Sequence, residues 1–172
     1  MRTLSRIVLL VLAGCVAFDT YAQDKPVSTN DREFVVKASQ GVLAEVALAS
    51  LAQKSAASDG VKKFAQRTLT EQGNTLKAID AAAAKVGMTP PRNPSEKQLG
   101  DLKAFSHLSG PSFDREYIRL MVEAHQAAVM LFEKQMKDGD SPELKALAGE
   151  TLPVLRERLK IARALKERKA QA

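Results

Sequence analysis

Residues 113–135 read FDREYIRLMVEAHQAAVMLFEKQ and form the longest uninterrupted helical pattern in the chain. Apolar residues recur there at steps of three and four, from Phe113 through Met121 to Phe132, which is the period of one face of an α-helix. His125, one of two histidines, lies within this face or at its edge. The stretch therefore predicts a long amphipathic helix that buries one side against partner helices.

Two segments before this stretch show the same period and predict two partner helices. The first is expected to begin at a capping box formed by Asn30 and Glu33. The second follows a cap at Ser58 or Asp59 and ends at Gly87, because glycine readily adopts the left-handed conformation that stops a helix. Neither helix would be stable alone, so both are expected to bury their apolar faces in a common core.

The connections complete the expected topology. The segment MTPPRNP at 88–94 contains three prolines, so it predicts a long non-helical crossover, after which Ser95 caps a short extra helix. Ser141 caps a fourth long helix, in which Pro153 predicts either a bend or a restart. The chain is thus predicted to be all-α, with a four-helix bundle over residues 31–168.

The first residues are expected to be a targeting signal rather than part of the fold. A positively charged start precedes the apolar run 7–18, which is too short to span a bilayer. Small residues up to Ala22 predict cleavage after it, so residues 1–22 would be a signal peptide and residues 23–30 a polar leader. The expected location of the domain is the periplasm.

An alternative interpretation of the same segment stays open. The run LAGC that ends at Cys15 resembles the lipobox of bacterial lipoproteins, in which Cys15 would be lipidated and would anchor the protein. The length of the whole apolar run favours plain secretion. Cys15 is the only cysteine, so neither interpretation gives the domain a disulfide. No transmembrane span is expected in the mature protein.

Charge and motifs restrict the expected function. The chain of 172 residues has a net charge of +6, and cations gather toward its C-terminal end, from Arg156 in the last helix to Lys169 at the start of the basic tail 169–172. Cations suit the negative end of a helix, and they would also attract an anionic envelope surface. Nucleic acid is not an expected partner, because the chain shows no recognition motif. The chain also shows no glycine-rich phosphate loop, nucleophile elbow or plausible cysteine nucleophile, which disfavours an enzyme.

Each long helix carries one polar residue in or beside its apolar stripe: Glu45, Gln72, His125 and Arg158. One hypothesis is an interior layer in which Arg158 pairs with Glu45 and the other two complete the hydrogen bonds, because a buried charge must be paired. Helical stripes also drift, so Glu45 and Arg158 could instead lie at the flank with their charges in water. A functional metal or ligand site is the third interpretation.

Three stretches resemble the secreted bacterial family called domain of unknown function 4142: VKKFAQRTLTEQGNTLKAI, FDREYIRLMVEAHQAAVMLFEKQ and LPVLRERLKIARAL. The resemblance covers roughly residues 31–165, and the pattern FDxxY…MVxxHxxxVxLFE is its most specific part. It implies an exported, ferritin-like four-helix bundle, and it implies no agreed activity.

The resemblance also implies where a metal would lie. Members of the family often carry histidine at the positions of Gln72 and Arg158 as well as His125, and three such ligands would hold a transition metal. Here only His125 remains, and an arginine cannot donate a lone pair. No metal or other cofactor is therefore expected. If a metal binds, His125 and Glu45 are the expected ligands.

The expected function is that of an exported, non-catalytic helical bundle with a structural or binding role in the cell envelope. The alternative is a ferritin-like metal-binding or redox protein that uses His125 and the neighbouring polar residues of the core.

Overall fold

Five helices account for nearly all of residues 26–170, the part of the chain that the structure, a computed structural model, describes. Four helices are long and one is short, and no strand occurs in this part of the chain. The all-α prediction is confirmed. The helices are α1 (Thr29–Ser55), α2 (Asp59–Lys85), α3 (Glu96–Phe105), α4 (Gly110–Asp138) and α5 (Pro142–Ala170).

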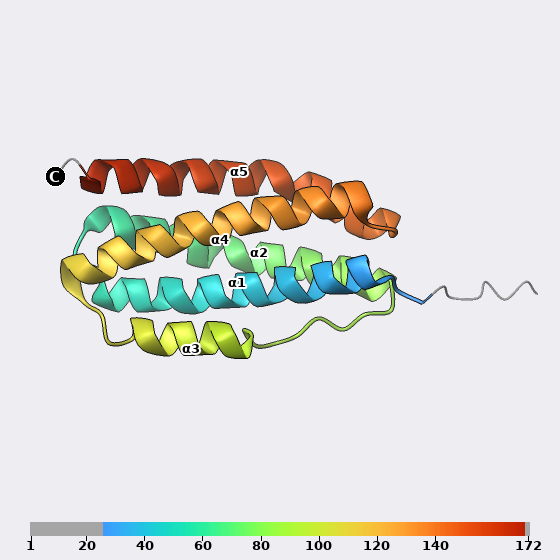
Figure 1. Ribbon diagram of the computed structural model, residues 1–172, viewed down its shortest axis with the longest axis horizontal. Helices are drawn as coiled ribbons and strands as arrows, with labels where there is room; N and C mark the ends of the chain where they lie inside the picture. Colours follow the sequence, from blue (N-terminus) through green and yellow to red (C-terminus); the bar gives the residue numbers. More distant parts are fainter. Residues whose placement is uncertain (1–25, 171–172) are drawn as a thin grey trace, which may run out of the picture.

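The long helices form a bundle of two antiparallel hairpins (Figure 1). α1 pairs with α2 and α4 pairs with α5, while α1 also packs on α4 and α2 on α5. The crossover from α2 to α4 runs back along the molecule, and within it α3 lies beside α1. The predicted four-helix bundle, with its proline-containing crossover and short extra helix, is confirmed.

The core contains two hydrophobic clusters, one toward each end of the bundle. The first lies around Leu48, Phe64 and Tyr117. The second lies around Phe34 and Ile79. In every long helix the polar residue noted in the sequence falls between the residues of one cluster and those of the other. The apolar faces of the helices are therefore interrupted at one level, near the middle of the bundle.

The helix starts agree with the sequence at three places and differ at one. Ser58, Ser95 and Ser141 cap α2, α3 and α5 through their side-chain oxygens, as predicted. α1, however, is capped by Ser28, whose Oγ accepts a hydrogen bond at 3.1 Å from the backbone N–H three residues later. The predicted cap at Asn30 is wrong because this earlier serine supplies the acceptor. Asn30 lies in the first turn and bonds to the end of α4 instead.

Gly87 and Pro153 act differently on their helices. Gly87 has a φ of 69° and ends α2, as predicted, and the N–H of the next residue bonds back to the carbonyl of Ala83 at 2.9 Å. Pro153 lies inside α5, which continues through it, so the predicted alternative of a helix restart is wrong. The residue four positions earlier, whose carbonyl would crowd the proline ring, is Gly149, which has no side chain to add to the crowding.

Asp31 and Asp114 each tie one hairpin to the turn of the other. The Asp31 carboxylate on α1 accepts hydrogen bonds from the backbone N–H groups of Asp140 and Ser141, at 3.2 and 3.0 Å. The Asp114 carboxylate on α4 accepts hydrogen bonds from the N–H groups of residues 57 and 58, both at 3.0 Å. Both aspartates are buried. Because these charge-assisted bonds join the two hairpins at opposite ends, they fix how the hairpins dock.

α1 is long and apolar enough to cross a membrane, judged by length and composition only. The sequence had predicted no such span after the signal. In the bundle, 44% of the apolar window of α1 is buried, and its buried face includes Asp31 and Glu45. The core helix of a bundle meets the same criterion, and α1 packs against α2 and α4 in this bundle.

Three predictions made from the ends of the sequence fall wholly or partly outside the described residues. They are the signal peptide 1–22, the lipidation of Cys15 and the last two residues of the basic tail. The expected polar leader is described only from residue 26, and α1 already begins at Thr29 within it.

Candidate functional site

The four polar residues singled out in the sequence lie together across the middle of the bundle. Their exposed fractions are 6% for Glu45, 1% for Gln72, 0% for His125 and 4% for Arg158. Each comes from a different long helix and occupies a position between the two hydrophobic clusters. The interpretation in which Glu45 and Arg158 extend into water does not describe this structure. We call these four residues the polar layer.

Gln72 links its neighbours on both sides within the polar layer. Its Nε2 donates a hydrogen bond to the Glu45 carboxylate, and its Oε1 accepts one from Arg158 Nη1 at 3.1 Å. Arg158 Nε donates to Glu71 Oε2 at 3.0 Å. The expected direct pair of Arg158 with Glu45 is therefore wrong, because the Gln72 amide, which offers both a donor and an acceptor, lies between them.

Glu71 is a partner of the polar layer that the sequence did not reveal. Its side chain is 30% exposed, and it accepts hydrogen bonds from Arg67 and Arg158. Partial burial acts to raise the pKa of Glu71, but the hydrogen bonds and positive charges of the two arginines bring that pKa below its ordinary value. The spacing of four between Arg67 and Glu71 indicated only a pair on the helix surface, since nothing in it points toward α5.

His125 has one bonded ring nitrogen and one buried nitrogen without a hydrogen-bond partner in the described part of the chain. Nδ1 lies 2.8 Å from the carbonyl oxygen of Met121. Because a carbonyl only accepts, Nδ1 carries the hydrogen. Nε2 lies 3.9 Å from Glu45 Oε2. Glu45 is therefore the ionisable side chain next to this nitrogen, but the two atoms are too far apart for a hydrogen bond.

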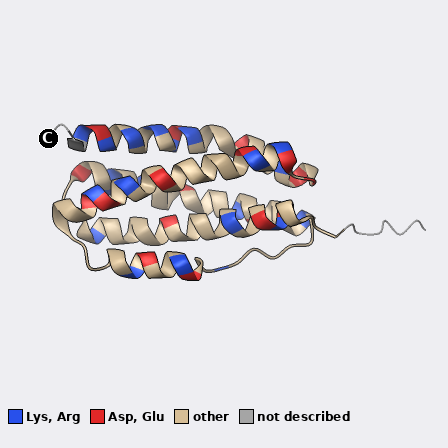
Figure 2. Ribbon diagram, viewed as in Figure 1, with Lys and Arg blue, Asp and Glu red and all other residues tan. Residues whose placement is uncertain are grey.

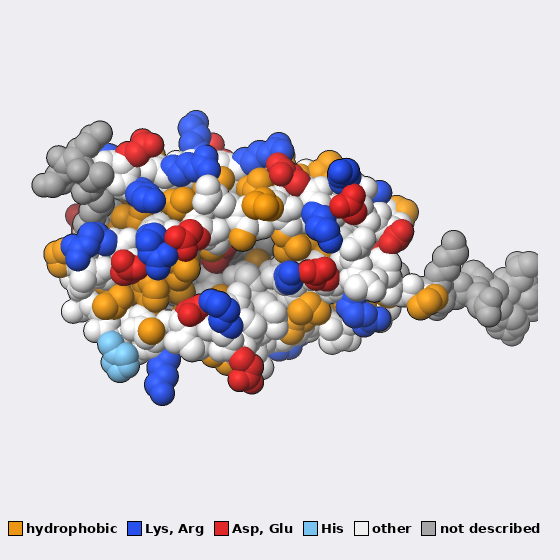
Figure 3. Space-filling model, viewed as in Figure 1, with side chains coloured by type: hydrophobic (Ala, Val, Ile, Leu, Met, Phe, Trp, Pro, Cys, Tyr) orange, Lys and Arg blue, Asp and Glu red, His pale blue; other side chains and the backbone are white. Residues whose placement is uncertain are grey.

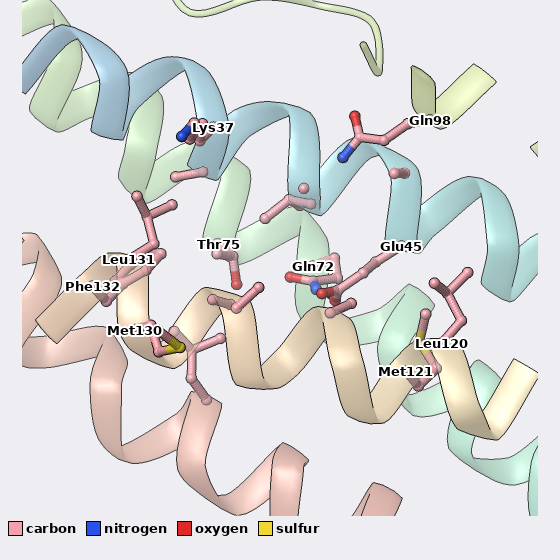
Figure 4. Close-up of a pocket in the computed structure, with 18 of the residues that line it drawn as sticks. Lys37, Glu45, Gln72, Thr75, Gln98, Leu120, Met121, Met130, Leu131 and Phe132 are labelled. Atoms are coloured by element: carbon pink, nitrogen blue, oxygen red, sulfur yellow. The ribbon is translucent and has the colours of Figure 1, made fainter. Parts of the chain in front are cut away.

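A cleft of about 580 Å³ opens beside the polar layer, between α1 and α4. Figure 4 shows Glu45 and Gln72 next to each other in it, with Leu120 toward one end and Leu131 toward the other. Figure 3 shows hydrophobic side chains bordering a recess near the middle of this face. Small residues on the two facing helices leave the space open: Ala38, Gly41 and Ala44 on α1, and Ala124, Ala127 and Ala128 on α4.

The sequence did not lead to a prediction of the cleft. Gly41 follows the buried residue Ala38 by one helical step on α1, but it is only half-buried and lines the cleft. A Cβ atom added at Gly41 would meet no atom within 4 Å. The small residues at steps of three were the available signal, and the same spacing is also typical of closely packed helices, so the sequence could not distinguish the two.

Charged groups differ between the rim and the floor of the cleft. On the rim, Glu33 is hydrogen-bonded to Lys37 and lies 4.0 Å from Lys134, and these two cations lower the pKa of Glu33. On the floor, Glu45 has no lysine or arginine within ion-pair distance among the described residues. Burial, and then the negative charge of Glu45, raise the pKa of Tyr117 above its ordinary value.

The donors present do not fit a transition-metal site. Within residues 26–170, no three His, Cys, Asp or Glu side chains are placed to hold one ion. His125 Nε2 and Glu45 are two candidate donors, but the Gln72 amide beside them is already bonded on both sides. A transition-metal site in a protein uses three or more such donors, and the polar layer offers two.

The basic residues of α5 are less free than the sequence indicated. Arg158 is buried in the polar layer, Arg156 Nη2 binds Glu133 Oε1 at 2.8 Å, and Lys160 lies 4.0 Å from Glu157. Figure 2 shows that Lys and Arg outnumber Asp and Glu along the second half of α5. Contact of this helix with an anionic envelope surface stays a prediction.

Fold and site together define a four-helix bundle protein with a buried polar layer and an adjoining cleft. The sequence matches the family described as "Domain of unknown function (DUF4142)" over residues 17–165, which is most of the chain. The protein belongs to this family, as the resemblance predicted. No protein of curated function matches the chain.

Solved structures show the same fold at low sequence identity. A DUF305 fragment from Deinococcus radiodurans matches with a TM-score of 0.71 and 19% identity, over 84% of this chain and 99% of its own. CopM in the Cu(I)-bound form matches with a TM-score of 0.66 and 21% identity, over 82% of this chain and 97% of its own. CopM in the Cu(II)-bound form gives 0.62 and 20%, over 81% and 95%. These likenesses support the helical-bundle fold.

Proposed function

We propose that this protein binds a small, largely apolar molecule in the cleft between α1 and α4 without converting it, and that it does so in the periplasm. The observation that carries the proposal is the cleft. Its volume of about 580 Å³ lies in the range of sites for small organic molecules. Most of its wall is aliphatic, and Glu45 and Gln72 supply a few polar groups on its floor, which is the composition typical of such sites.

The polar layer supports binding by holding those groups in place. Glu45 accepts from Gln72, and Gln72 in turn accepts from Arg158, so the three side chains brace one another across three helices. Groups that are held in one geometry lose little conformational entropy when a ligand arrives. The floor of the cleft is therefore ready to bond the polar end of a ligand.

A cleft-filling substitution tests the proposal in the exported, purified protein. Gly41→Leu places a side chain in the cleft, where a Cβ meets no atom within 4 Å. Gly73→Leu is the matched control, because Gly73 is also a helical glycine with open space at its Cβ and does not line the cleft. We expect the neutral fluorescent probe N-phenyl-1-naphthylamine to bind the unaltered protein and the Gly73→Leu variant, and to bind Gly41→Leu at least roughly tenfold more weakly.

Equal affinity of the probe for the two variants would contradict binding in the cleft. Absence of binding to the unaltered protein, with its helical circular dichroism intact, would contradict the proposed function itself.

The periplasmic part of the proposal rests on the N-terminal sequence. The apolar run 7–18 and the small residues up to Ala22 are compatible with a signal peptide. The mass of the mature N-terminus, measured on protein from an exporting bacterium, tests this. A chain that begins at Gln23 would support secretion, and a lipidated Cys15 would support anchoring at the envelope. An uncleaved chain would contradict both.

A second candidate function is transition-metal binding. The copper-bound neighbours and the unbonded Nε2 of His125 beside Glu45 favour it, whereas the incomplete donor set opposes it. Elemental analysis of the purified protein, with titration of copper, zinc, iron and manganese, distinguishes the candidates. A stoichiometric metal that is lost in a His125→Ala variant would support this second function, and absence of binding would remove it.

A further inference from the structure

We propose that the cleft selects a cationic ligand: an apolar molecule that carries a protonated amine, which binds the carboxylate of Glu45. This inference rests on the proposed function and adds to it the chemical class of the ligand.

Glu45 is a buried carboxylate with too few partners in the described part of the chain. A carboxylate accepts hydrogen bonds at both oxygens, yet the bond that Glu45 receives comes from Gln72. The guanidinium of Arg158, one residue further along the layer, is directed at Glu71 and Gln72 instead. A buried carboxylate is stabilised by an opposite charge, and no described lysine or arginine supplies one to Glu45, so a cation that enters the cleft would bind there.

His125 does not supply the missing donor. Its Nε2 lies 3.9 Å from Glu45 Oε2, which is beyond hydrogen-bond distance. In neutral His125 this nitrogen is itself an acceptor without a donor. An ammonium group has three donors and no acceptor, so it complements a site where acceptors are in excess. His125 does not line the cleft, and Glu45 does, so Glu45 is the group that a ligand meets.

The rest of the cleft favours an apolar body on the ligand, and its two rim lysines, Lys37 and Lys134, already face Glu33. Its walls are mostly Ala, Leu, Val and Met side chains. The rim cation Lys37 is bound to Glu33, and the rim carboxylate Asp101 is bound to Lys97 at 2.8 Å. A carboxylate ligand of the same shape would place its charge against Glu45, and this repulsion excludes it.

Three probes that differ only in their polar group test the charge preference. 1-Naphthylmethylamine, 1-naphthalenemethanol and 1-naphthoate share one apolar body and are cationic, neutral and anionic at pH 7. Isothermal titration calorimetry on the exported, purified protein measures their affinities. We expect the amine to bind roughly tenfold to a hundredfold more tightly than the alcohol, which is the range for a hydrogen bond to a charged group, and the acid to bind most weakly.

The isosteric variant Glu45→Gln identifies the group responsible. It should reduce the affinity for the amine to that for the alcohol while leaving the alcohol nearly unchanged. Glu33→Gln is the matched control, since Glu33 lines the rim but is bonded to Lys37 in water, and it should leave the preference for the amine intact. If Glu45→Gln does not fold, the comparison of the three probes on the unaltered protein still tests whether the cleft prefers a cationic ligand.

Other outcomes overturn the inference at identifiable steps. Three results would refute selection by Glu45 and leave the proposed function unaffected. They are equal binding of the amine and the alcohol, tighter binding of the acid, and a preference for the amine that persists in Glu45→Gln. The same holds if N-phenyl-1-naphthylamine binds and none of the three probes displaces it. If neither that probe nor any of the three binds, the inference and the proposed function both fail.

Discussion

Replacing Arg158 with alanine is the sharpest test of the polar layer. The residue is 4% exposed, and it holds α5 to α2 through Glu71 and Gln72. The substitution removes a buried cation and the long side chain that carries it. It leaves the Gln72 carbonyl oxygen buried without its donor, and it removes one of the two arginines that bind Glu71.

The expected loss in the free energy of unfolding follows from those contacts. Removing one partner of a buried ion pair costs about 3–5 kcal/mol. Two hydrogen bonds to a charged group, each contributing about 1.5–3 kcal/mol, lead to the same range. The Glu71 side chain is 30% exposed, so water can solvate it in the variant, and we expect the lower part of the range, about 3–4 kcal/mol. For a chain of this size the melting temperature should fall by roughly 6–16 °C.

Arg156→Ala is the matched control on the same helix. Its side chain is 59% exposed and binds Glu133 at 2.8 Å, so its removal should cost less than about 1 kcal/mol. Equilibrium unfolding in guanidinium chloride, followed by helical circular dichroism, measures both variants. A loss below about 1 kcal/mol for Arg158→Ala, or an equal loss in the two variants, would refute the buried layer.

Three further predictions concern stability. Asp31→Asn and Asp114→Asn should each cost about 1.5–3 kcal/mol in thermal unfolding, because each weakens the acceptor of two backbone N–H groups across the hairpins; an unchanged melting temperature would contradict this role. Because the pKa of Glu71 is lowered on folding, its ionised carboxylate stabilises the fold at pH values above the pKa of the group in the unfolded chain. This stabilisation is lost as pH falls through the pKa of the group in the folded protein. Glu71→Gln should therefore be less stable than the unaltered protein near pH 7, and the difference should shrink as pH falls below the ordinary glutamate pKa of about 4.3, whereas a difference independent of pH would exclude a charge effect. Gly87→Ala should lower the free energy of unfolding by about 1 kcal/mol because the φ of Gly87 is 69°. Gly73→Ala should raise the free energy of unfolding by about 1 kcal/mol because Gly73 is in regular helix. Equal effects of the two substitutions would contradict the left-handed helix end.

The helices and their order were predictable because their signals are local. The stripe from Phe113 to Phe132 shows the helical period directly, and Ser95 and Ser141 mark helix starts within one turn of the bonds that they make. The cap of α1 was misassigned since Ser28 and Asn30 are both good capping residues two positions apart. Local chemistry does not rank such neighbours.

The candidate site was predictable in its members and not in its bonds. Glu45, Gln72, His125 and Arg158 each interrupt an apolar stripe, which marked them as core or flank residues, and the structure buries all four. Which of them bond depends on the axial offset and rotation of each helix against its neighbours. A shift of one turn moves a side chain by about 5.4 Å, more than the length of a hydrogen bond, so Glu71 rather than Glu45 could become the partner of Arg158.

The sequence by itself determined the helical class, the order of the elements, the crossover and the four polar positions in or beside the apolar stripes, because period, capping and proline chemistry act over a few residues. Only the tertiary structure decided that Glu45 and Arg158 are buried, which polar residues bond to each other, and that a cleft exists. The cleft depends on how far apart α1 and α4 lie where Gly41 faces alanines, and that distance is set by the larger side chains packed at both ends of the bundle.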